Sequence, residues 1–148
     1  MDDTTPTRIG WDASTLDRDR PVAQARHRTR TWVRTHWGLP ELADTVELAV
    51  AELCTNAVRH GGGLAGLELI LATPRVYVPP YLRVLVTDHA PGRQPRLPSC
   101  GVNLLSEGGR GLHLVATLAR RWGWHRTGFD EKQVWCTFEL RDGNGPPG

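Results

Sequence analysis

Between Pro40 and His60, apolar residues recur at the spacing of a single helical face. They are Leu42, Val46, Ala49, Val50, Leu53 and Ala57. This pattern predicts an amphipathic helix that ends at Gly61-Gly62-Gly63. Side chains four residues apart stack on a helix, so Glu52, Asn56 and His60 form a polar row with Arg59 beside it. The row borders the apolar arc, where it can face a pocket; the simpler interpretation is a solvated helix edge.

A second helical pattern precedes this one. Pro21 follows Asp17 to Arg20, which indicates a helix start, and the helix is expected to run to about Trp37. Its expected core contacts are Val22, Ala25, Trp32 and Val33. Its exposed side carries Arg26, Arg28, Arg30 and Arg34. That basic side is either a solvated face or a docking surface for an acidic partner. Upstream, Arg8 to Trp11 is expected to form a short edge strand.

Alternating apolar residues predict two strands after the glycines. They cover 64–72 and 81–87, and the second delivers Asp88 at its end. The proline-bearing stretch from His89 to Glu107 has no clean periodicity, and so long a loop is usually functional or disordered. A third helix is expected from Leu112 to Ala119, followed by a hairpin of strands 122–126 and 133–140.

This order of elements predicts an α+β fold. We expect a two-layer sandwich, with one mixed, mainly antiparallel sheet and about three helices on one face. Residues 16–140 would form one domain. Residues 1–15 would be a flexible N-terminus with the edge strand, and 141–148 a disordered tail.

Composition narrows the functional classes. The chain has 148 residues, enough for one domain with a real core, and a net charge of +2, too small to argue for nucleic acid. Cys54, Cys100 and Cys136 are widely spaced and form no metal-binding pattern, which suggests a reducing compartment. No signal segment or membrane-length apolar run is apparent, so a cytoplasmic protein without membrane contact is expected.

The glycine-rich turn at Gly108-Gly109-Arg110-Gly111 suits a phosphate group. Free backbone N–H groups and the helix dipole favour an anion at a helix start, and glycines let the backbone approach closely. Alone, this signal is weak. The chain has no GK[ST] sequence for a Walker A loop, and the turn lacks the preceding strand and third glycine of a dinucleotide fingerprint.

Three side chains could complete such a site. Asp88 could accept hydrogen bonds from an exocyclic amino group such as that of adenine, or it could simply be a turn residue. The Asn56 side-chain oxygen could join phosphate oxygens around Mg²⁺. Glu52, one turn earlier, could accept a proton from a hydroxyl or water attacking a terminal phosphate.

Together these motifs resemble the Bergerat-type ATP-binding fold of gyrase, Hsp90-type chaperones, histidine kinases and MutL. The likeness is greatest to the anti-sigma-factor serine/threonine kinase branch and its stand-alone actinobacterial relatives. The matching boxes are Glu52 to Gly61, Asp88 to Gly92 and Gly109 to Val115, with Arg121-Trp122-Gly123 and Lys132 to Trp135 also typical. The resemblance spans roughly residues 16 to 140.

The resemblance implies that the protein binds ATP with Mg²⁺. By analogy Glu52 would be the general base, Asn56 the magnesium ligand and Asp88 the adenine reader. Gly92 would shape the adenine pocket. The expected phosphate cradle comprises Gly109, Arg110, Gly111 and Leu112, with Arg59 and His60 near the pocket mouth. Residues from Gln94 to Gly108 would form an ATP lid.

Two functions follow from the resemblance. The first is a serine/threonine protein kinase that phosphorylates an anti-sigma antagonist, holds a sigma factor and forms a homodimer. The second is a non-catalytic nucleotide-binding module that sequesters a regulator through its lid and first helix. The adenine box departs from the usual Asp-x-Gly-x-Gly, since Ala90 replaces the first glycine and Pro91 stiffens the turn. This departure bears on ATP affinity more than on the fold.

Overall fold

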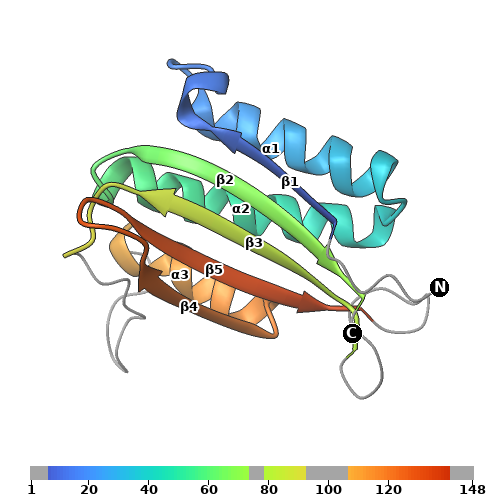
Figure 1. Ribbon diagram of the computed structural model, residues 1–148. Coiled ribbons are helices and arrows are strands. Elements are labelled where there is room, and N and C mark those ends of the chain that lie inside the picture. Colours follow the sequence, from blue (N-terminus) through green and yellow to red (C-terminus); the bar gives the residue numbers. More distant parts are fainter. Residues whose placement is uncertain (1–6, 74–78, 93–106, 141–148) are drawn as a thin grey trace.

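The computed structural model describes residues 7–73, 79–92 and 107–140, with side chains of 107–110 not described (Figure 1). Within these residues the chain forms five strands, three α-helices and two short helical segments. They follow in the order β1 (Thr7–Asp12), η1 (Ala13–Thr15), α1 (Pro21–Thr31), η2 (Trp32–His36), α2 (Pro40–His60), β2 (Leu64–Ala72), β3 (Tyr81–Asp88), α3 (Glu107–Leu118), β4 (Arg121–Arg126) and β5 (Lys132–Glu139).

The strands form one sheet in the order β1-β2-β3-β5-β4. All of its pairings are antiparallel. The β3–β5 pairing joins strands separated in sequence by α3 and β4, and it sets Asp88 opposite Lys132. The register between β2 and β3 shifts between Leu64 and Gly66, so β2 is irregular where the chain leaves α2.

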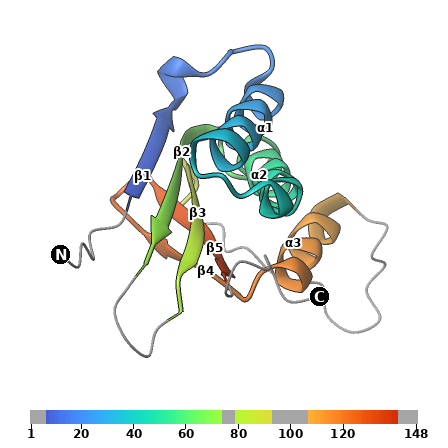
Figure 2. The ribbon, with the colours of Figure 1, turned by 90° about the vertical axis from the view of Figure 1, so that its right-hand side faces the viewer.

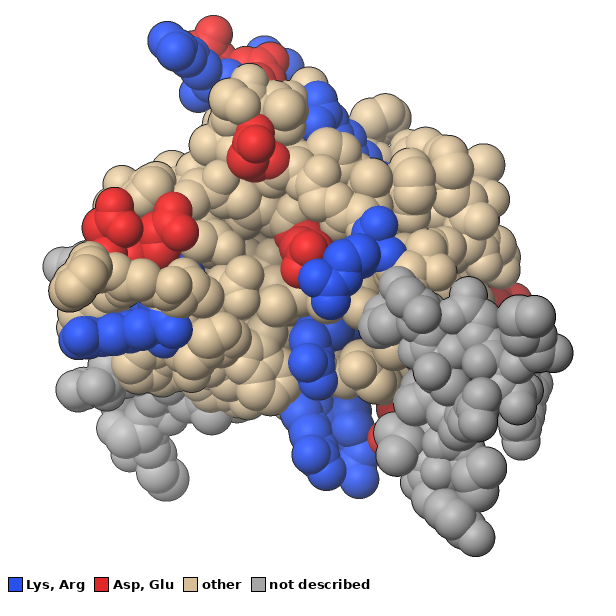
Figure 3. Space-filling view, viewed as in Figure 1, with Lys and Arg blue, Asp and Glu red and all other residues tan. Residues whose placement is uncertain are grey.

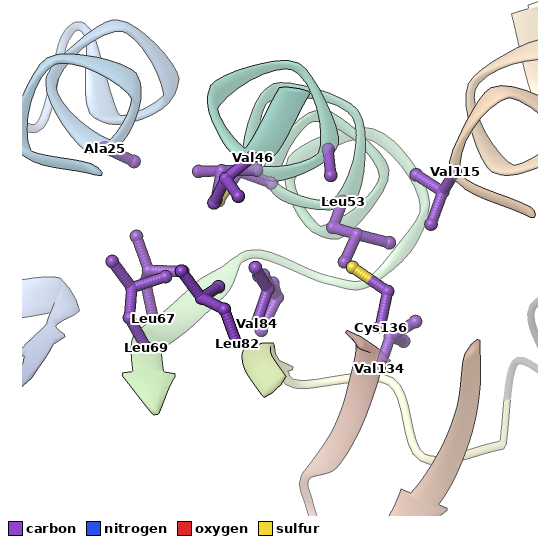
Figure 4. Packing of buried hydrophobic residues seen from close by; sticks show 14 of the residues in the cluster. Ala25, Val46, Leu53, Leu67, Leu69, Leu82, Val84, Val115, Val134 and Cys136 are labelled. Carbon is purple, nitrogen blue, oxygen red and sulfur yellow. The ribbon is translucent and has the colours of Figure 1, made fainter. Parts of the chain in front are cut away.

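The three helices cover one face of the sheet, with α2 between α1 and α3 (Figure 2). Buried side chains of α2 such as Val46 and Leu53 meet the inner face of the sheet in Figure 4. There they pack with alternate strand residues such as Val84 and Cys136. The apolar positions that recur at helical and strand spacing in the sequence thus all face one core.

The opposite face of the sheet is open. Figure 3 views this face and shows basic and acidic residues in several separate places rather than one basic patch. On it, the Arg83 guanidinium lies 5.1 Å from the Tyr81 ring centroid and 5.2 Å from that of Trp135. The Trp135 ring in turn covers Gly123, where a Cβ would come within 2.6 Å of it. Aromatic and polar contacts therefore shield the backbone on this side.

The α+β sandwich predicted from the sequence is confirmed. The edge strand, the start of α1 at Pro21 and the bounds of β2 also agree with the prediction. Beyond Thr31, the first helix continues as the π-helical segment η2, where the His36 ring stacks on Trp32 with centroids 4.0 Å apart. Within the described ranges, no helix combines the length and apolar character that crossing a bilayer requires.

The predicted start of the third helix was wrong. We expected the glycine-rich turn to precede a helix that begins at Leu112, but α3 begins at Glu107 and includes all three glycines. Helical hydrogen bonding therefore starts before the glycines despite their low propensity, which shows tertiary packing overriding a local signal. The expected tail, the first six residues and all but the last two residues of the expected lid lie outside the described residues.

Candidate functional site

The polar row lies along the last turns of α2. Glu52 and Asn56 are half-buried, whereas Leu53 and Ala57, which directly follow them in the sequence, are buried in the core. The row therefore borders the packed face of the helix, as its spacing predicts. Arg59 and His60 are exposed in the last turn. The helix edge thus presents a carboxylate and an amide next to the core and two basic side chains at its end.

Helix α2 ends in a tight glycine turn. The N–H groups of Gly61 and Gly63 both donate to the Ala57 carbonyl oxygen, each at 3.0 Å. Gly62 and Gly63 have φ values of 70° and 119°, which residues other than glycine rarely adopt. The turn sends the chain directly into β2 and keeps the end of α2 close to the sheet.

Asp88 meets the end of α2 at Gly61. The His89 N–H donates to the Gly61 carbonyl oxygen at 2.8 Å. A Cβ added to Gly61 would lie 2.6 Å from both Cγ and Oδ2 of Asp88. Only a residue without a side chain fits there, so the first and second sequence boxes are in contact.

Asp88 is 3% exposed, and its charge is matched inside the protein. The Lys132 ammonium donates to Oδ1 and Oδ2 of Asp88, both at 2.8 Å, and also to the Ala90 carbonyl oxygen at 2.8 Å. The Ala90 N–H donates to Oδ1 at 2.9 Å. These donors offset the desolvation of the carboxylate without any ligand. Ala90, which departs from the usual glycine, thus holds Asp88 through its backbone.

Lys132 was missed as a site residue in the sequence analysis. The signal was present: the alternation of β5 places Lys132 on the same face as buried Val134 and Cys136. A lysine in that register needs an internal acceptor, and Asp88 lies opposite in the β3–β5 pairing. Recognising this required the strand order, which the sequence alone did not supply.

The start of α3 meets the polar row at Glu52. A Cβ added to Gly111 would overlap Glu52 Oε2 and would lie 3.3 Å from its Cδ. The close approach of the two helices thus depends on Gly111 having no side chain. The third sequence box therefore lies against the first, on the side of α2 opposite α1 (Figure 2).

The remaining predicted residues differ in how the structure places them. The Leu112 side chain is 2% exposed and belongs to the core, so only its backbone could face a ligand. Gly109 and Arg110 lie in the first turn of α3. Gly92 is exposed, and a Cβ there would meet no atom of the described residues within 4 Å. Within the described part of the chain, the Cβ position of Gly92 therefore has no close contact with the other predicted site residues.

Two buried cysteines flank this region without offering reactive thiols. Cys54, between Glu52 and Asn56, and Cys136 on β5 are both fully buried. Burial raises the pKa of each thiol to about 12. At neutral pH both are uncharged and behave as small apolar core residues, so nucleophilic chemistry at this site would not come from them.

The protein's own acidic groups provide no metal cage in the described part of the chain. There, no group of three or more His, Cys, Asp or Glu side chains could hold a metal ion. The half-buried Asn56 amide oxygen fits the oxygen preference of Mg²⁺, which commonly binds one or two protein oxygens together with substrate phosphates. A magnesium ion would thus need oxygen atoms from a bound phosphate compound.

Comparison with known proteins identifies one match. A family described as the histidine kinase-like ATPase domain matches residues 16–138 of the chain. No curated protein matches the sequence significantly.

Proposed function

The chain belongs to the histidine kinase-like ATPase family, and from this membership we propose that it is an ATP- and Mg²⁺-binding regulatory protein. The observation that carries the proposal is the position of α2 between two glycine-dependent contacts. At the end of α2, the missing side chain of Gly61 leaves room for Asp88. On α3, the missing side chain of Gly111 leaves room for Glu52 of α2. Asp88 thus lies against the end of α2, and the N-terminal part of α3 lies against Glu52, and these two contacts support the proposed site.

In this proposal each side chain has one role. Asp88 accepts a hydrogen bond from the adenine amino group, and the Asn56 oxygen binds Mg²⁺, which would neutralise phosphate charge. The start of α3 lies under the phosphates, where the free N–H groups of its first turn, which includes Gly109 and Arg110, favour anions. Gly111 and Leu112 follow in the second turn and border the same site. Arg59 and His60 border the opening.

We further propose that the protein is a serine/threonine kinase. Glu52 accepts the proton of an attacking serine or threonine hydroxyl. The hydroxyl oxygen forms a bond to the γ-phosphorus as the bond to the bridging β,γ-oxygen breaks, and ADP leaves with that electron pair. The protein partners proposed by family resemblance are an anti-sigma antagonist and a sigma factor, and the protein itself is proposed to act as a homodimer in the cytoplasm.

A non-catalytic role is the second candidate, and one observation favours it. Asp88 already has Lys132 and the Ala90 N–H as donors, so the carboxylate is retained for structural reasons even without ATP. In this version the domain keeps the fold and sequesters a regulator without transferring phosphate.

Calorimetric titration with ATP tests the shared part of both candidates. We expect Mg²⁺-dependent binding and a nucleotide-dependent rise in Tm, because a ligand of the native state stabilises it by mass action. Asp88→Asn should weaken binding. An absence of ATP and ADP binding at millimolar nucleotide would contradict both versions.

Glu52→Ala separates the two candidates. The kinase proposal expects this variant to bind ATP as the wild type does but to lose phosphoryl transfer by about 10²-fold or more. Transfer can be followed with labelled ATP and partners captured by pull-down and identified by mass spectrometry. Unchanged transfer in Glu52→Ala would show that Glu52 is not the base, and a wild type that binds ATP but never transfers phosphate to a captured partner supports the non-catalytic role.

A further inference from the structure

Lys132 is the only lysine of the chain, yet it is 3% exposed. Its ammonium group has three protons, and three acceptors lie around it at 2.8 Å: both carboxylate oxygens of Asp88 and the Ala90 carbonyl oxygen. The polar contacts that the structure gives Lys132 are therefore all to acceptors of the protein itself. The buried Nζ faces these acceptors rather than solvent.

Asp88, by contrast, keeps one acceptor position. A carboxylate has about four lone-pair positions. On Asp88, Oδ1 accepts from Lys132 and from the Ala90 N–H, whereas Oδ2 accepts from Lys132 alone among the residues that the structure describes. Oδ2 is also the oxygen that packs against Gly61, where an added Cβ would lie 2.6 Å from it, and this contact helps to fix the carboxylate. The remaining acceptor position thus belongs to a single oxygen, held in one orientation.

We propose that Lys132 is a positioning residue for base selection, which fixes Asp88 so that Oδ2 accepts from an exocyclic amino group and rejects a carbonyl group in its place. This inference rests on the proposed ATP binding. An amino group donates to the open position on Oδ2. A carbonyl oxygen there would face a carboxylate oxygen, and two acceptors with no proton between them repel each other.

Without Lys132, the Ala90 N–H would be the one remaining donor of those described above. The carboxylate would then be free to turn toward water or toward other donors, such as the ring N–H of a base that carries a carbonyl group. Discrimination between amino and carbonyl bases should therefore fall. A site with rigidly placed polar groups discriminates strongly because the wrong ligand leaves one of them unpaired.

A purely structural role for Lys132 makes a different prediction. Lys132 links β5 to β3 and to the Ala90 backbone, so its loss could weaken binding simply by reducing the folded population. That effect lowers the affinity for every nucleotide by the same factor, because all of them bind the same folded molecules. The ratio of the affinities of one variant for two nucleotides is independent of the folded population. A change in this ratio therefore reports base selection.

The test compares ATP with ITP, which carries a carbonyl oxygen in place of the 6-amino group. Kd values for both are measured by calorimetry in the wild type, Lys132→Met and Lys132→Gln. We expect the wild type to prefer ATP on the order of 100-fold. Lys132→Met should bind ATP at least tenfold more weakly than the wild type does. Its Kd values for ATP and ITP should differ by only a fewfold. Lys132→Gln, whose amide can still donate to Asp88, should give an intermediate preference.

Arg30→Met removes an ion pair at the α1–α2 surface and should leave the ATP/ITP ratio unchanged. A folded Lys132→Met with the wild-type ratio would overturn the inference while ATP binding stands. If Lys132→Met does not fold, the ratio in Lys132→Gln decides in the same way. A wild type that binds neither nucleotide contradicts the proposed function itself, and the inference with it.

Discussion

Ion pairs occur at both ends of α2, and they differ in their access to water. Near its start, Arg30 of α1 pairs with Asp44 and Glu47 at 2.7 and 2.9 Å, with the Arg30 side chain 43% exposed. Near its end, Lys132 pairs with Asp88 at 2.8 Å, with side chains 4% and 5% exposed. Distances are alike, but only the second pair lacks water as an alternative partner. Because water can replace a partner only in the exposed pair, we expect loss of one partner to cost more stability in the buried pair, although the distances are alike.

The arginine side of α1 illustrates the exposed case. Arg26 and Arg30 both contact Glu47, and the Arg28 guanidinium donates to the Thr15 carbonyl oxygen at 2.7 Å. The hydrogen bond to Glu47, with the nearby charge of Asp44, raises the pKa of Arg30. These three arginines therefore join α1 to its neighbours, and the docking surface for an acidic partner stays a prediction.

The largest expected effect is loss of one partner of the buried pair. Lys132→Met should lower the free energy of unfolding by about 3–5 kcal/mol, because it leaves the Asp88 carboxylate buried without its counter-charge. Urea denaturation measures this loss. The double variant Asp88→Asn/Lys132→Met should lose less than the sum of the two single variants. A Lys132→Met loss below about 1 kcal/mol would contradict the contrast between the two ends of α2.

Gly61→Ala should have the next largest effect. Its Cβ would lie 2.6 Å from the Asp88 carboxylate, which Lys132 holds in place and which cannot move aside easily. We expect a loss of about 1–3 kcal/mol in urea denaturation, together with weaker ATP binding. Gly128→Ala is the matched control, since a Cβ there meets nothing within 4 Å. Equal losses in the two variants would show that the Gly61 contact is not tight.

Gly111→Ala should affect activity more than stability. Its Cβ would meet the far end of the Glu52 side chain, which can rotate away, and alanine improves helix propensity by about 1 kcal/mol. The unfolding free energy should therefore stay within about 1 kcal/mol of the wild type. Displacing the proposed base should slow phosphoryl transfer by about tenfold or more, measured with labelled ATP and a captured partner. Unchanged transfer would argue against Glu52 as the base.

Arg30→Met should have the smallest effect. Water can replace Arg30 at Asp44 and Glu47, so we expect a slight decrease in Tm that vanishes as salt concentration rises. Thermal unfolding at low and high salt measures it. A large decrease that salt does not reduce would mean that the α1–α2 pairs act as the buried pair does.

Several features of this protein could be predicted because they depend on local periodicity. The 3.6-residue pattern of α2 and the two-residue alternation of β2 and β3 identify their buried faces without knowledge of their neighbours. Pro21 marks the start of α1 for an equally local reason, its fixed φ. The helical spacing of Glu52 and Asn56 likewise predicts that they lie in one row at the edge of the buried face. The start of α3 could not be predicted, because glycines have a low helix propensity and the contact of Gly111 with Glu52 of α2 leaves no local pattern.

The sequence by itself thus determined the elements, the fold class and the residues on each face. The tertiary structure alone decided which of those residues meet. Asp88 and Lys132 are 44 positions apart, and they pair because β5 lies beside β3 in the sheet. Gly61 and Gly111 matter because two backbones approach each other there, a constraint that no local pattern records. Periodicity is a property of one segment, whereas burial of a charge depends on every segment around it.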